Sequence, residues 1–136
     1  MIAKNVTIQD LEQTLRLVNK IYDNNVTFNR LEQYGKRVRF TLRVKDSKGK
    51  GARRGHTGRR LINACWHVHG DFFDILFKIN PRAVIRSAGR EITKDYGNWE
   101  DWNIGSIINP LYYSEACECW RWRDEQEINK IKEMVK

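Results

Sequence analysis

The chain has 136 residues and a formal charge of +8, a size that fits one domain spanning residues 1–136. Hydrophobic residues make up 40% and charged residues 31% of the chain, which favours a globular protein, and no apolar run approaches the roughly 18 residues of a membrane span. Three cysteines make a poor disulfide framework, and the first residues lack the apolar core of a secretory signal. We therefore expect a cytoplasmic protein.

The first predicted element is an amphipathic helix that begins after Thr7. Asp10 stands three residues after Thr7, as in a capping box with a shorter acid. Apolar residues then recur at helical spacing, at Leu11, Leu15, Val18 and Ile21. The polar run 23–25 is expected to end this helix.

An antiparallel hairpin is predicted next. Val26, Phe28 and Arg30 alternate into a first strand, which should turn at Tyr34-Gly35-Lys36. The second strand has the clearest period-two pattern of the chain, at Val38, Phe40, Leu42 and Val44. The glycine-rich stretch 46–58 has no apolar periodicity and is expected to be a mobile loop.

The second half of the chain predicts further strands and two helices. A strand should run over 60–69 with Ile62, Ala64, Trp66 and Val68 towards the core, broken by Gly70. Asp71 should then cap a short buried helix that ends at Asn80-Pro81. Short strands are expected at 83–85 and 91–93, a loop-rich lobe over 95–119, and an amphipathic helix over 121–135. The predicted fold class is α+β, with an antiparallel or mixed sheet, an N-terminal helix, a central buried short helix and a C-terminal amphipathic helix.

Cysteine and histidine residues form two tracts with a spacing of two. If 60–69 is a strand, one face carries Cys65, His67 and His69, and a second tract supplies Cys117 and Cys119. Thiolate and imidazole are ligands that zinc prefers, so these five residues are candidate zinc ligands. The tracts lack the usual Cys-x2-4-Cys spacing. The alternative is that Cys65 is a small buried hydrophobic residue and the histidines lie on a polar sheet face.

The positive charge is concentrated in one segment. Between Arg43 and Arg60 the chain has eight basic residues against one acid, Asp46, together with four of its nine glycines. Such a segment can follow a phosphate backbone and release its counterions, and glycines allow close approach of the main chain. The candidate contacts to nucleic acid or another anion are Lys48, Lys50, Arg53, Arg54, Arg59 and Arg60. The alternatives are a solvated loop or a segment that pairs with an acidic protein.

Catalytic and pocket-forming candidates are less complete. A histidine base with a carboxylate to orient it could come from His67, His69, Asp71 and Asp74, but no full catalytic signature is present, which favours a non-enzymatic protein. Trp99, Trp102 and Asn103 could line a pocket for a planar ligand. The alternative for these three is a tightly folded loop.

The stretch 58–119 resembles a set of small uncharacterised proteins that recur in bacteriophage genomes. The similar pieces are Gly58-Arg59-Arg60, 64–69 (ACWHVH), Asp71-Phe72-Phe73, Pro81-Arg82-Ala83, 103–106 (NIGS), Pro110 and Cys117-Glu118-Cys119. The resemblance implies a phage or prophage origin, and hence the cytoplasm of the host cell, and it implies no catalytic residues.

The sequence leads to one main functional hypothesis and two alternatives. The main hypothesis is a small basic, non-enzymatic protein that binds the phosphate backbone of nucleic acid through its Gly/Arg/Lys arm. The first alternative is a host-defence antagonist that binds an acidic host protein or sequesters a nucleotide. The second alternative is a metal-dependent hydrolase or nuclease.

Overall fold

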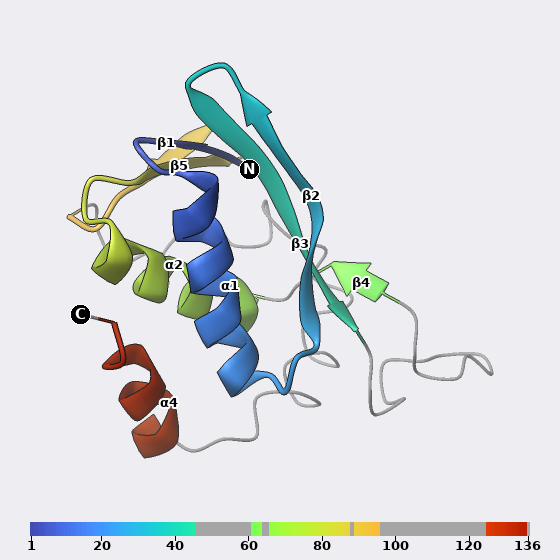
Figure 1. The fold of residues 1–136 in the computed structure, drawn as a ribbon, viewed down its shortest axis with the longest axis vertical. Helices are drawn as coiled ribbons and strands as arrows, with labels where there is room; N and C mark the ends of the chain where they lie inside the picture. The colour runs from blue at the N-terminus through green and yellow to red at the C-terminus, as the bar shows by residue number, and fades with distance from the viewer. Residues whose placement is uncertain (46–60, 64–65, 88, 96–124, 136) are drawn as a thin grey trace.

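The computed structural model describes residues 1–45, 61–63, 66–87, 89–95 and 125–135. Within these ranges the elements follow one another as β1 (Ile2–Lys4), α1 (Ile8–Ile21), β2 (Val26–Tyr34), β3 (Arg37–Lys45), β4 (Leu61–Asn63), α2 (Trp66–Ile79), β5 (Val84–Ser87), β6 (Arg90–Ile92) and α4 (Glu125–Lys132). The predicted α+β fold class is confirmed, with the N-terminal, central and C-terminal helices in their expected places (Figure 1).

The described strands form one antiparallel sheet in the order β2-β3-β1-β5-β6. The ninth residue of β3, Lys45, pairs with Leu61, so β4 joins the end of β3. The first strand of the chain thus lies in the middle of the sheet, between β3 and β5. β1 was not predicted, because three residues are too few to establish a period.

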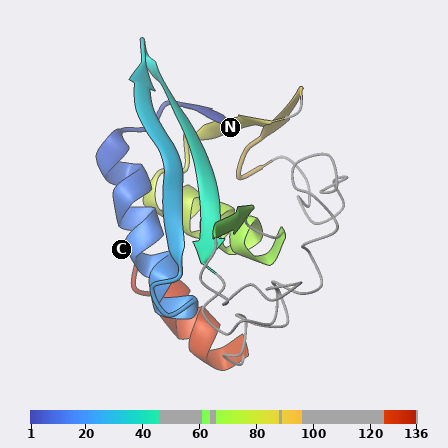
Figure 2. The same cartoon turned by 90° about the vertical axis from the view of Figure 1, so that its right-hand side faces the viewer.

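The predicted hairpin is confirmed as β2 and β3, which pair along most of their length. Gly35 has φ of +62° and forms a two-residue loop with Lys36. A positive φ at the first loop position is the requirement of a type II′ turn, which favours glycine. This turn reaches beyond the rest of the sheet (Figures 1 and 2).

A β-bulge divides β2 into two halves. The alternation of side chains between the two sheet faces is shifted by one residue after the bulge. The register shifts between Phe28 and Arg30, so that Arg30 pairs with Thr41 and Leu31 with Phe40. The simple alternation of Val26, Phe28 and Arg30 therefore fails at its last member, because the extra residue reverses the facing of everything after it. Arg30 lies on the face of the sheet opposite to the core.

Helix α1 has the predicted N-terminus. Thr7 Oγ1 accepts a hydrogen bond from the Asp10 N–H at 3.1 Å, and the Asp10 carboxylate accepts one from the Thr7 N–H at 3.1 Å. The capping box thus satisfies two backbone donors that a helix leaves unpaired. Asp23 and Asn24 adopt positive φ after the last turn, as expected of a polar helix stop.

Helix α2 begins earlier than predicted, at Trp66. The strand expected over 60–69 is present at Leu61–Asn63 but is wrong from Trp66 onward. Gly70 does not interrupt the helix, and Asp71 lies inside it instead of capping it. Val68 and Phe72 are fully buried, and so are Ile75 and Leu76. Their helical spacing favours the longer helix, and the burial outweighs the cost of about 1 kcal/mol for a glycine in its interior.

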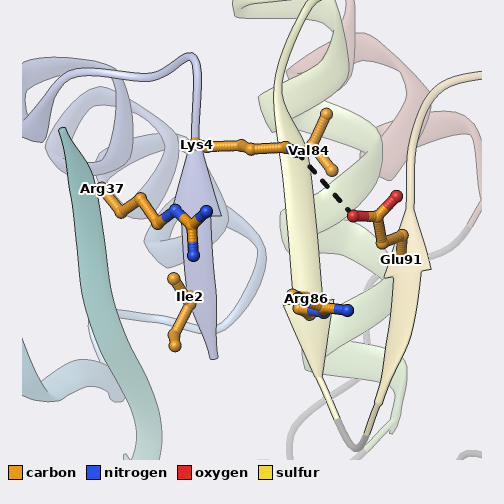
Figure 3. Close-up of a pocket in the computed structure, with 6 residues that line it drawn as sticks. All are labelled: Ile2, Lys4, Arg37, Val84, Arg86 and Glu91. Atoms are coloured by element: carbon orange, nitrogen blue, oxygen red, sulfur yellow. Dashed lines mark ion pairs between the residues drawn. The ribbon is translucent and has the colours of Figure 1, made fainter.

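One hydrophobic core lies between the helices and the sheet. Ala3, Val38, Phe40 and Ile85 contribute from the strands, and Ile128 from α4. The predicted inward residues of the last helix, Ile128, Ile131 and Val135, all pack on this core. Helices α1 and α2 contact each other, α4 contacts α1, and the helices lie behind the strands in Figure 3. The opposite sheet face, called the outer face below, is therefore free of described helices.

Candidate anion-binding face

Most of the residues singled out from the sequence lie outside the described ranges. This holds for the predicted loop 46–58 and for the candidate contacts of the basic arm 43–60, namely Lys48, Lys50, Arg53, Arg54, Arg59 and Arg60. It holds equally for Cys65, Cys117 and Cys119, and for Trp99, Trp102 and Asn103. Their proposed roles stay predictions.

The two histidines of the first tract do not share one face. Both lie in α2, and because a helix turns about 100° per residue, positions 67 and 69 are roughly 200° apart around its axis. His69 is buried, and the centre of its ring lies 6.1 Å from the centre of the Phe73 ring. Within the described ranges, no three His, Cys, Asp or Glu residues are grouped so that they could hold a metal ion. The zinc prediction assumed that these histidines lie in a strand, whereas the structure has a helix at both positions.

Two of the weak catalytic candidates, Asp71 and Asp74, meet in a polar cluster beside the core. Lys132 Nζ lies 2.9 Å from Asp71 Oδ1 and 2.8 Å from Asp74 Oδ2. The Tyr22 hydroxyl donates a hydrogen bond to Asp71 Oδ2 at 2.5 Å. The Asp71 side chain is only 5% exposed, and a carboxylate at this depth needs such partners. The cluster therefore joins α4 to α2 and to the end of α1.

The electrostatics of this cluster favour a charged lysine. Burial by itself would lower the pKa of Lys132, but the Asp71 and Asp74 carboxylates outweigh it and raise that pKa above its ordinary value. A lysine held in its ammonium form cannot act as a general base. The contacts are those of a structural ion cluster that holds α4 in place.

The outer face of the sheet carries an excess of positive charge. Because strand residues alternate between faces, the inward run Val38, Phe40, Leu42 and Val44 places the intervening residues of β3 outward. The described outward-facing cations are Lys4 on β1, Arg30 on β2, Arg37, Arg39 and Arg43 on β3, and Arg86 on β5. Only two described carboxylates, Glu32 and Glu91, share this face.

The register places these charges in rows across the strands. One row runs Glu32, Arg39, Ile2, Arg86, Glu91, and the next runs Tyr34, Arg37, Lys4, Val84. Figure 3 shows Arg37 reaching from β3 over β1, and Lys4 reaching over β5 towards Glu91. Lys4 Nζ and Glu91 Oε2 are 3.9 Å apart, with both side chains about half exposed. Such an exposed ion pair contributes little to stability. Lys4 can therefore bind another anion in place of the Glu91 carboxylate.

A second set of outer-face residues surrounds an open hollow of about 470 Å³. Arg30, Arg39 and Arg86 line it from three different strands, together with Thr41 and Ser87. The positive potential here acts on the α-amino group of Met1, whose pKa is lowered by burial and by the nearby Arg39 and Arg30.

The cations of the hollow are only partly neutralised. Arg30 Nε lies 3.5 Å from Glu32 Oε1, and the Arg39 guanidinium lies 4.6 Å from the centre of the Tyr34 ring. Among the described residues, Arg86 makes no ion pair within 4.0 Å. The Thr41 hydroxyl is shielded from solvent and has no hydrogen-bond partner among the described residues. An anion in the hollow would find guanidinium donors that the described residues leave unused.

The sequence interpretation missed this face, although the signal was present. The alternation that identified β3 as a strand also places Arg37, Arg39 and Arg43 together on its other side. The positions of Arg30 and Arg86 needed the bulge and the sheet order, which periodicity does not give.

Comparison with protein-family models, with curated proteins and with solved structures found no match for this chain. Among the described helices, none has the length and apolar character to cross a membrane.

Proposed function

We propose that this protein binds nucleic acid through the phosphate backbone, using the outer face of the sheet together with the basic arm. The observation that carries the proposal is the excess of positive charge on that face, where the described residues include six cations and two carboxylates. The glycine-rich part of the arm begins at Asp46, directly after Lys45 at the end of β3. Its cations therefore follow those of β3 in the amino-acid sequence. Cations along a surface bind the phosphate backbone mainly by releasing its counterions.

The regular spacing of the cations supports a backbone ligand. Outward residues on one strand lie about 6.6 Å apart, and neighbouring strands about 4.8 Å apart, so Arg37, Arg39 and Arg43 form a line of charge along β3. Arginine binds phosphate oxygens through two parallel N–H groups, which suits it to this role. The face thereby offers a phosphate-binding track without a need to read bases.

The salt dependence of binding tests the proposal. Fluorescence anisotropy with short single-stranded and duplex DNA and RNA, at increasing salt, should give a steep linear fall of log K with log salt. Replacing Arg37, Arg39 and Arg43 by Gln should reduce the slope by about 2 for single strands and about 3 for duplex. A variant with Arg53, Arg54, Arg59 and Arg60 changed to Gln tests the contribution of the arm.

The control removes equal charge from the helical side. Arg16, Lys20 and Lys78 are exposed on α1 and α2, and their replacement by Gln should leave the slope almost unchanged. Absence of binding at low salt, or equal slopes for the outer-face and helical-side variants, would contradict the use of the outer face. Thermal unfolding of each variant shows that the fold is retained.

A further inference from the structure

The hollow on the outer face has the form of a site for one compact anion. Arg39 and Arg86 are the two cross-strand neighbours of Ile2, so their Cα atoms lie about two strand spacings, or roughly 10 Å, apart. The side chains of Arg39 and Arg86 are long enough to reach across that distance and contact one anion from opposite sides. Arg30 approaches from β2, and the described lining of the hollow also includes the hydroxyl-bearing residues Thr41 and Ser87.

The charge of the hollow matches a doubly charged ligand. Three guanidinium groups line the hollow, and among the described residues only that of Arg30 has a carboxylate within 4.0 Å, that of Glu32. The guanidinium charges of Arg39 and Arg86 have no ion pair with a described residue. A phosphate monoester carries roughly −1.5 to −2 at neutral pH, whereas each backbone phosphate of a nucleic acid carries a single negative charge. The volume of about 470 Å³ also lies within the usual range of small-molecule sites.

We infer that this hollow binds a terminal phosphate group, carried either by the end of a nucleic-acid strand or by a free mononucleotide. The inference rests on the proposed function, because it assigns one part of the same face to strand ends. Arg39 and Arg86 would hold the phosphate from two sides, with Arg30 as the third donor. The track along β3 would then bind the backbone that leads away from that end.

Two oligonucleotides that differ only in their 5′ end test this site. Both have one sequence and a 3′ fluorophore, and one carries a 5′-phosphate where the other carries a 5′-hydroxyl. At moderate salt we expect the phosphorylated strand to bind about tenfold more tightly, as for hydrogen bonds to a charged group. Competition with AMP against adenosine tests the free mononucleotide, since only AMP should displace the probe.

Arg86→Gln and Arg37→Gln provide a matched pair of variants. Both residues are exposed on the outer face, but only Arg86 lines the hollow. Arg86→Gln should abolish the preference for the phosphorylated end, whereas Arg37→Gln should weaken both probes alike and keep their ratio.

The outcomes separate this inference from the proposed function. Equal binding of the two probes by the unmodified protein would overturn the phosphate site and leave backbone binding intact. Failure of every oligonucleotide to bind, with AMP still bound in a manner that requires Arg86, would support the site and overturn the proposed function. A preference for the phosphorylated end that survives Arg86→Gln would also overturn the site.

Discussion

Lys132 Nζ lies 2.9 Å from Asp71 Oδ1, and this contact ties the C-terminal helix to the middle of α2. Asp74 and the Tyr22 hydroxyl also belong to the cluster. Because α4 is short, with eight residues, it has little stability of its own. Its place on the core therefore depends on Ile128 and on this ion cluster.

Replacing Lys132 by Met should lower the free energy of unfolding by about 3 kcal/mol, because it removes an ammonium group that lies 2.9 Å from the buried Asp71 carboxylate. Urea denaturation measures the change. Lys130→Met on the same helix is the control, since Lys130 is exposed and its loss should alter stability by less than about 0.5 kcal/mol. Equal effects of the two substitutions would contradict the role of the cluster.

Stability should also fall at alkaline pH through Lys132. Its pKa in the folded protein is raised above the ordinary value of 10.5, so its stabilising contribution is complete below that pH. The contribution is lost as the pH rises through the higher folded value, where the ammonium group deprotonates. The difference in unfolding free energy between the unmodified protein and Lys132→Met should therefore shrink above pH 10.5. A constant difference up to strongly alkaline pH would count against it.

Gly35→Ala should destabilise the hairpin by about 1 kcal/mol, because an L side chain is strained at the positive φ of this turn. A Cβ at this position would meet no atom within 4 Å, so the backbone alone causes the loss. Asn tolerates the left-handed region better, and Gly35→Asn should cost less. If Ala and Asn prove equal to glycine in thermal unfolding, the type II′ turn is wrong.

Thr41→Val should leave the stability unchanged or raise it by about 1 kcal/mol, since the Thr41 hydroxyl is shielded and unpaired. The matched control is Thr14→Val in α1, where Thr14 Oγ1 donates to the Asp10 carbonyl oxygen at 2.7 Å. That substitution removes a real hydrogen bond and should cost about 1 kcal/mol. A greater loss at Thr41 than at Thr14 would show that the Thr41 hydroxyl has a partner in solution.

Local signals predicted the first third of the fold well. The Thr7–Asp10 capping box and the alternation of β3 depend only on residues close in sequence, and both are present as expected. The strand prediction failed at 66–69 because a short run with period two fits a strand and the first turn of a helix equally. The continuation from Val68 to Phe72 and Ile75 decides for the helix.

The candidate site was harder to predict because it depends on pairing between distant strands. Arg39 and Arg86 become neighbours of Ile2 only through the order of the sheet, and Arg30 reaches the outer face only through the bulge after Phe28. The contact of Lys132 with Asp71 likewise has no local signal. Composition indicated an anion partner, but only the packing indicates where on the described chain that partner would bind.

The central position of β1 has a consequence for how the chain folds during synthesis. A ribosome makes β1 before its partners, and the second of these, β5, follows only after residue 83 has been made. Until then β1, which contains Ala3, can form hydrogen bonds with a neighbouring strand on one side only. Its unpaired edge favours association between nascent chains. Pairing over such a long separation also slows folding. We therefore expect fragments that end before β5 to aggregate, while the full chain folds only after its middle has emerged.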